Sequence, residues 1–333
     1  MVIATVPLLW HPVVNAWAPP EAIAPPSYLP AVEARHAREP FDQSLIDGLK
    51  RDNPVGIVIG DSMAGRVDPV RLGELLGGKV STLVAPSTGS GWWYLAFKNV
   101  VITSGVRPKW VFVFGRDTNF TDPMFRLLEP YRTKLDWVAR DREPELNAVV
   151  GRRLNGPWHH VHAALDRAYA VSRAQAWIEP QIAPWLARIA VGNRQKTKLL
   201  AGLNEAFGLS HLRPIAQADM AAADDRDADF AANIGDALLP SWVALARANG
   251  LRVVFIKVLR RPVDGHPPPD SAALQRYTTD LRAWLVARGA EFIDDRDDPA
   301  MAALPYADGD HIAGEGMTPY AELLAARLEK IRR

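Results

Sequence analysis

Residues 57–63 read Ile57-Val58-Ile59-Gly60-Asp61-Ser62-Met63, an apolar run that ends in a glycine, an aspartate and a serine. Continuous apolar, β-branched character over this length is typical of a strand that is covered on both faces, as in a parallel sheet. Four more runs of this kind follow along the chain. With the first, which we begin two residues earlier, the predicted strands are residues 55–60, 79–85, 109–115, 251–258 and 291–294.

Helical stretches separate these predicted strands. They cover residues 68–76, 92–104, 238–249 and 271–288, and an amphipathic helix over 319–333 closes the chain. Gly250 and Gly289 each follow a helix and precede a strand, which is where a helix C-cap glycine belongs. Alternating strands and helices predict a doubly wound α/β fold with a parallel sheet.

One connection is too long for that plan. Residues 116–238 contain no good strand run, and Ala, Leu and Arg recur there at helical spacing. Structureless loops of this length are rare, so we predict a helical insertion over residues 120–237, between the third and fourth strands. The domain that it interrupts covers residues 51–333, and residues 1–50 are interpreted as an N-terminal arm and Pro-rich spacer.

Composition excludes several classes of protein. The 333 residues carry 39 Lys and Arg against 38 Asp and Glu, a net charge of +1, so no global field attracts nucleic acid. The chain has no cysteine, which excludes disulfides, thiol catalysis, iron–sulfur clusters and Cys-bound zinc. We expect neither a nucleic-acid partner nor a cofactor.

The first twenty residues contain no Asp, Glu, Lys or Arg, and Pro7 and Pro12 interrupt their apolar run. The run is too short and too broken to span a bilayer by itself. Two interpretations stay open: an arm laid over the domain surface, or the end of a membrane anchor whose first half is missing from this chain.

Gly60-Asp61-Ser62 ends the first predicted strand, so the serine lies at the carboxyl edge of the sheet, where doubly wound proteins bind ligands. The helix expected after it would favour a developing negative charge near the hydroxyl. A turn or a helix cap uses the same residue types.

A second motif, Asp308-Gly309-Asp310-His311, lies just before the last predicted helix. An aspartate three residues before a histidine can hold the ring through Nδ1 and leave Nε2 free as a base. For this chemistry Ser62 and His311 must meet in space. A serine followed at a distance by Asp-x-x-His resembles the SGNH/GDSL hydrolase superfamily, over residues 53–115 and 251–333.

The resemblance implies a flavodoxin-like, three-layer α/β/α fold with a five-stranded parallel sheet. It also implies acyl transfer through an ester on Ser62, with His311 as general base and then acid and Asp308 orienting the ring. We expect no metal at this site.

The family builds its oxyanion hole from the serine N–H, a glycine after the second strand and an asparagine after the third. Ser62 and either Gly89 or Gly91 match the first two donors. The third block departs from the pattern, because Asp117 falls where the asparagine is expected, and a carboxylate would repel an oxyanion. Asn119 through a longer turn, or Arg116, then takes the donor role. A structural ion pair between Arg116 and Asp117 is the alternative.

The nearest members are those that modify cell-envelope polysaccharides, including the alginate O-acetyltransferase-like group. Their chemistry implies an acylated small molecule or polysaccharide as partner, a membrane protein as acyl donor and a periplasmic or extracytoplasmic location, with the cytoplasm left open. Trp92 and Trp93 follow the glycine loop and could stack on a sugar or pack in the core. The candidates for substrate contacts are Asp61, Trp92, Trp93, Arg116 and Asp117. Water as acceptor makes an esterase and a sugar hydroxyl makes a transferase, and both stay open.

Three competing hypotheses use other features of the chain. A cation could bind Asp308, Asp310, His311 and Glu315. A second metal-like cluster is His159, His160 and His162 in the insertion. In the third, the fold is a catalytically weakened module that binds a glycan or a partner protein through insertion arginines: Arg152, Arg153, Arg167, Arg173, Arg188 and Arg194.

Overall fold

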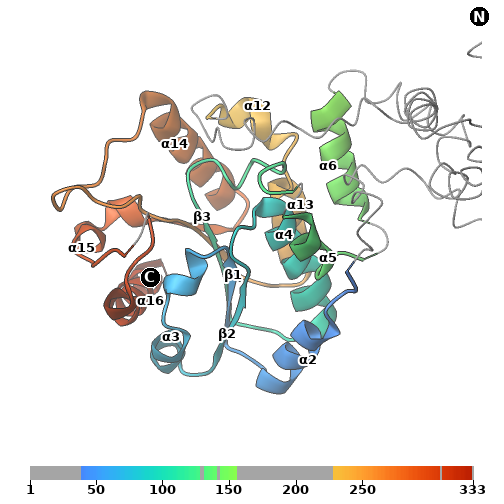
Figure 1. Ribbon diagram of the computed structural model, residues 1–333, viewed down its shortest axis with the longest axis horizontal. Helices are drawn as coiled ribbons and strands as arrows, with labels where there is room; N and C mark the ends of the chain where they lie inside the picture. Colours follow the sequence, from blue (N-terminus) through green and yellow to red (C-terminus); the bar gives the residue numbers. More distant parts are fainter. Residues whose placement is uncertain (1–38, 128–130, 141–142, 156–227, 308–309, 332–333) are drawn as a thin grey trace, which may run out of the picture. The chain divides into compact units, whose positions relative to one another are not determined.

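The computed structural model describes residues 39–127, 131–140, 143–155, 228–307 and 310–331. The chain divides into two compact units, Met1–Ala31 with Val150–Pro214, and Val32–Val149 with Ile215–Arg333. Nearly all described residues belong to the second unit, which contains the sheet and the helices that cover it (Figure 1). Among the described helices, none combines the length and the apolar character that crossing a membrane requires.

The sheet has five parallel strands in the order β2-β1-β3-β4-β5. Their bounds are β1 Gly56–Gly60, β2 Val80–Val84, β3 Trp110–Gly115, β4 Val253–Lys257 and β5 Glu291–Asp294. Each lies inside the run predicted from sequence, so the predicted fold class is confirmed. The strand order reverses at β1, which lies between β2 and β3. The carboxyl ends of β1 and β3 are therefore the topological switch point, where doubly wound folds bind their ligands.

The structure describes ten α-helices. Their bounds are α2 Gln43–Asp52, α3 Pro69–Leu76, α4 Ser90–Leu95, α5 Arg132–Asp136, α6 Pro144–Asn155, α12 Phe230–Ile234, α13 Leu239–Ala248, α14 Ala272–Val286, α15 Pro299–Ala302 and α16 Met317–Ile331. Helix α4 continues as η3, a π-helical stretch over Ala96–Ile102. Short 3-10 turns occur at η2 Ala64–Arg66, η6 Asp295–Asp297 and η7 Gly314–Gly316.

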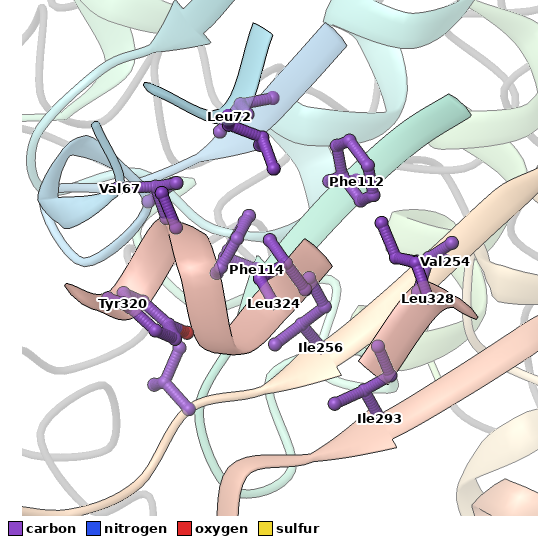
Figure 2. Close-up of a cluster of buried hydrophobic side chains, with 14 of the residues drawn as sticks. Val67, Leu72, Phe112, Phe114, Val254, Ile256, Ile293, Tyr320, Leu324 and Leu328 are labelled. Carbon is purple, nitrogen blue, oxygen red and sulfur yellow. The ribbon is translucent and has the colours of Figure 1, made fainter. Parts of the chain in front are cut away.

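Helices α3 and α16 cover one face of the sheet (Figure 1). Figure 2 shows the hydrophobic core that these two helices form with the strands. The core residues labelled there are Val67, Leu72, Phe112, Phe114, Val254, Ile256, Ile293, Tyr320, Leu324 and Leu328. On the other face, Trp242 of α13 packs against Phe255 of β4 and Phe97 of η3, with ring centroids 5.6 and 5.7 Å apart. The predicted three layers are therefore present.

Helix α2 corrects the predicted start of the domain. Residues 43–50, which the sequence analysis places in the arm and spacer, belong to this helix, which Asp42 caps and which buries Ile46 and Leu49. Leu45, Ile46 and Leu49 share one face at helical spacing, so a local signal for this helix is present in the sequence. Residues 1–38, with the uncharged start and the Pro-rich run, lie outside the described residues.

Between β3 and β4 the described residues form α5, α6, α12 and α13, while residues 156–227 of the predicted insertion lie outside the described part. The predicted start of the insertion at residue 120 falls inside the core. Phe120 is buried, and its ring lies 5.5 Å from Phe255 and 6.3 Å from Trp93.

Candidate active site

Ser62 lies in a turn immediately after β1, at the carboxyl edge of the sheet. The 3-10 turn η2 follows it, and α3 begins only at Pro69, with Asp68 as its N-cap. The helix expected directly after the serine is therefore a single 3-10 turn, and the predicted helix over 68–76 follows it as α3. Gly-Asp-Ser instead closes a tight turn in which the Ala64 N–H donates to the Asp61 carbonyl at 3.1 Å.

His311 lies on a short antiparallel pairing just before η7 and α16. The Ala307 N–H donates to the His311 carbonyl and the Ala313 N–H to the Pro305 carbonyl, both at 2.8 Å. These bonds direct the histidine toward β1. Nε2 of His311 lies 2.8 Å from Oγ of Ser62, a hydrogen bond between residues 249 positions apart. The two motifs therefore meet in space, as the chemistry requires.

Of the two aspartates in the histidine motif, Asp308 lies outside the described residues, so its orienting role stays a prediction. Asp310 is described and is held by arginines. One carboxylate oxygen pairs with the Arg116 guanidinium, and the other accepts the Arg261 backbone N–H at 2.9 Å. Asp310 thus ties the histidine segment to the ends of β3 and β4.

Asp117, at the position of the expected asparagine, is buried with φ +48°. Its carboxylate contacts the Arg260 guanidinium at 3.0 and 2.9 Å and Nε of Arg116 at 3.3 Å. Two cations therefore compensate the charge that was expected to repel an oxyanion. Arg116 contacts both Asp117 and Asp310, which favours the structural ion pair over a donor role for this arginine.

Asn119 is buried in the turn after β3, and its backbone N–H donates to the Arg116 carbonyl at 2.9 Å. The turn thus places Asn119 at the carboxyl edge of the sheet, the edge at which Ser62 also lies. Its role as an oxyanion donor stays a prediction.

Gly89 and Gly91 lie where the loop after β2 enters α4. A Cβ on Gly89 would come within 2.3 Å of the Phe125 carbonyl, and one on Gly91 within 2.9 Å of Leu127. Both glycines therefore allow the segment after β3 to pack closely on this loop. That packing is a reason for glycine that the sequence did not reveal, and the oxyanion role of their N–H groups stays a prediction.

Trp92 and Trp93 are core residues. Trp93 is fully buried and donates from Nε1 to the Thr88 hydroxyl at 3.0 Å, while Trp92 donates to the Lys134 carbonyl at 2.9 Å. Rings that are covered on both sides offer no face to a sugar. The stacking prediction for these two tryptophans is therefore wrong.

The buried Asp61 carboxylate stabilises the turn that contains Ser62. Its Oδ1 accepts the Met63 N–H at 2.9 Å, and its Oδ2 lies 3.6 Å from the Arg126 guanidinium. Burial raises the pKa of this carboxyl, while the Met63 N–H bond and the charge of Arg126 oppose that rise. Arg126 was not singled out from the sequence, because no motif marks it and only the fold brings it beside Asp61.

The described residues do not support either of the two hypothesised metal sites. Within the ranges that the structure describes, no three His, Asp or Glu side chains gather where they could hold an ion. Asp310 is engaged by two arginines, and Asp308 lies outside the described residues. His159, His160 and His162 also lie outside them, as do the insertion arginines from Arg167 onward.

Comparison with solved structures finds two that are similar to this chain. One is a provisionally named acylhydrolase of Bacteroides fragilis, 13% identical, with a TM-score of 0.36, covering 84% of this chain and 88% of its own. The other is a GDSL-like lipase of Bacteroides thetaiotaomicron, 14% identical, with a TM-score of 0.38, covering 86% and 98%. At these scores neither likeness carries an argument about activity. No family model and no curated protein matches the chain.

Proposed function

We propose that this protein is a serine-dependent acyltransferase or esterase that forms an acyl-enzyme on Ser62. The observation that carries the proposal is the 2.8 Å hydrogen bond between Oγ of Ser62 and Nε2 of His311 at the carboxyl edge of the sheet. A hydroxyl becomes a nucleophile when a positioned base removes its proton during attack, and this pair has the required reach.

In the proposed reaction, Oγ of Ser62 attacks the carbonyl carbon of an ester while its proton passes to Nε2 of His311. The bond to the leaving alcohol then breaks, and the alcohol takes that proton. Water or an acceptor hydroxyl next gives its proton to Nε2 and attacks the acyl carbon. The bond to Oγ breaks, and Ser62 recovers its proton. Asp308 is proposed to orient the ring through Nδ1.

The developing oxyanion needs hydrogen-bond donors near Ser62. We propose the N–H groups of Ser62 and of Gly89 or Gly91, with the Asn119 amide as the third donor. The compensation of Asp117 by Arg260 and Arg116 supports a working site, because an uncompensated carboxylate at that position would oppose charge development.

We further propose that the acyl group is acetyl and that the substrate is a carbohydrate or a cell-envelope glycan outside the cytoplasm. This part of the proposal rests on the resemblance of the Ser62 and His311 motifs to those of enzymes that modify cell-envelope polysaccharides. The buried Trp92 and Trp93 do not support it. An acylated membrane protein is the corresponding donor if the acceptor is a sugar hydroxyl.

The decisive experiment measures turnover of 4-nitrophenyl acetate together with labelling by a fluorophosphonate probe. Ser62→Ala and His311→Ala should each lower kcat/KM by about a thousandfold or more, because members of such a unit are strongly interdependent. The matched control is His266→Ala, which removes an exposed imidazole from a turn remote in sequence from both motifs and should retain turnover.

Near wild-type turnover in either site variant would contradict the assigned roles. An unlabelled Ser62, with glycan binding unchanged in Ser62→Ala, would favour the binding module instead. Measuring acetate release and sugar acetylation, with and without a carbohydrate acceptor, distinguishes hydrolysis from transfer.

A further inference from the structure

Arg126 holds an unusual backbone conformation in the loop after β3. Its φ is +55°, in the left-handed region that side-chain-bearing residues rarely adopt. Ser87 and Asp117, in the loops that follow β2 and β3, share this property with φ values of +61° and +48°. Non-glycine residues in this region persist only where their surroundings impose it, and they are concentrated at functional sites.

The surroundings of Arg126 do impose it. The Asp122 carboxylate accepts the Met124 and Phe125 N–H groups at 3.0 and 3.2 Å, and the Asp122 carbonyl accepts the Ser90 hydroxyl at 2.8 Å. The Phe125 carbonyl lies against Gly89, with no room for a side chain between them. Asp122 and Phe125 thus fix the loop to the start of α4 immediately before Arg126.

Aromatic rings hold the side chain of Arg126 in place, and its guanidinium N–H groups remain able to donate hydrogen bonds to a ligand. Its guanidinium carbon lies 4.7 Å from the Phe125 ring centroid and 5.8 Å from that of Tyr131. Among the residues that the structure describes, its ion-pair partner is Asp61, whose Oδ2 lies 3.6 Å away, beyond hydrogen-bond distance, and 29% of the Arg126 side chain is exposed. Arg260, by contrast, contacts Asp117 directly at 2.9 Å.

Position makes these spare donors relevant to the reaction. Asp61 is the residue directly before Ser62, so a guanidinium that faces Asp61 lies beside the serine turn. A guanidinium held over aromatic rings has a defined plane and can bind a carboxylate through two parallel N–H bonds, which an ammonium cannot do.

We infer that Arg126 binds a carboxylate group of the substrate, close to the ester that Ser62 attacks. The inference rests on the proposed function and adds the substrate class: an ester flanked by a carboxylate on its acyl side or its alcohol side. The rival interpretation is that Arg126 only balances the charge of Asp61, in which case it affects stability and leaves substrate preference alone.

The test compares kcat/KM for anionic and neutral esters. The acyl-side pair is mono-4-nitrophenyl succinate and 4-nitrophenyl acetate, and the alcohol-side pair is 4-acetoxybenzoate and phenyl acetate. Wild-type protein should prefer the anionic ester of one pair. Arg126→Gln should lower that preference about tenfold or more, as expected for the loss of charge-assisted hydrogen bonds, and Arg126→Lys should restore only part of it.

Arg252→Gln is the matched control. Arg252 also lies over an aromatic ring, 4.2 Å from the Trp110 centroid, and pairs with one carboxylate, Glu291 at 3.2 Å. It directly precedes β4, at the amino edge of the sheet and away from Ser62, so its substitution should leave the preference as in wild type.

Three results would overturn the inference while the proposed function stands. They are a wild type that prefers neither anionic ester, an Arg126→Gln variant with an unchanged preference, and a variant that loses neutral and anionic turnover in equal proportion. A failure of the proposed function looks different: no ester is turned over in a manner that depends on Ser62, and the inference then falls with it.

Discussion

Two substitutions at Asp310 measure how firmly the histidine segment must be held. One carboxylate oxygen of Asp310 pairs with Arg116, and the other accepts the Arg261 backbone N–H at 2.9 Å. Asparagine keeps an oxygen for that N–H and loses only the charge. Because 20% of the Asp310 side chain and 39% of the Arg116 side chain are exposed, the lost ion pair is worth less than about 1 kcal/mol.

Asp310→Ala removes the ion pair and also the acceptor of the Arg261 N–H. A hydrogen bond to a charged group contributes about 1.5–3 kcal/mol, so the alanine variant should lose about 2–4 kcal/mol of the interactions that hold His311. If the lost interaction energy raises the activation free energy by misplacing the His311 imidazole, kcat/KM drops about 30-fold or more in Asp310→Ala. In Asp310→Asn it drops at most about fivefold.

The assay is kcat/KM for a neutral acetyl ester, with urea unfolding of each variant as a check on folding. Asp308→Asn is the comparison, because it replaces the predicted orienting acid and should lose most of the activity. The reasoning is refuted if Asp310→Asn is as severe as His311→Ala, or if Asp310→Ala is no worse than Asp310→Asn. A greater loss in Asp310→Asn than in Asp308→Asn would mean that the wrong carboxylate was assigned.

Two further predictions concern the scaffold of the site. Gly89→Ala brings a Cβ within 2.3 Å of the Phe125 carbonyl and should cost about 1–3 kcal/mol in urea unfolding, whereas Gly48→Ala in α2, with its nearest atom at 3.7 Å, should add about 0.5–1 kcal/mol. An unchanged midpoint for Gly89→Ala would contradict the packing argument. Asp68→Ala removes the cap of α3 and should cost about 1 kcal/mol at neutral pH. Hydrogen bonding, above all from the Arg71 N–H, lowers the pKa of Asp68. The stabilisation is therefore present above the unfolded-state pKa and is lost as the pH falls through the lowered value, so wild type and variant should converge in acid.

The strands were predictable because their signal is local. A strand buried on both faces needs a continuous apolar run, such as the one that became β3, whatever the rest of the chain does. The left-handed residues Gly250 and Gly289, with φ values of +64° and +75°, occupy the helix ends where glycine predicted them. Helix α2 carried a local signal as well, because Leu45, Ile46 and Leu49 share one face and Asp42 caps its start, but it was grouped with the Pro-rich run that precedes it.

The candidate site was predictable only in part. The order and spacing of the serine and histidine motifs predicted their meeting through the resemblance to a hydrolase superfamily, and the hydrogen bond between Ser62 and His311 agrees with that prediction. The roles of Trp92 and Trp93 were not predictable, since a ring at the start of a helix has the same local sequence whether a sugar or the protein covers it. Their burial depends on segments distant in sequence: the Lys134 carbonyl accepts from Trp92, and Phe120 packs against Trp93.

The sequence by itself determined the elements, their order and the two motifs, because apolar periodicity and turn chemistry act between near neighbours. Tertiary structure alone decided which charges meet. It paired Asp117 with Arg260, tied Asp310 to Arg116 and brought Arg126 to within 3.6 Å of Asp61. These contacts join residues 65 to 194 positions apart. Coulomb interactions and hydrogen bonds depend on distance in space, which only the packing of the sheet and its loops establishes.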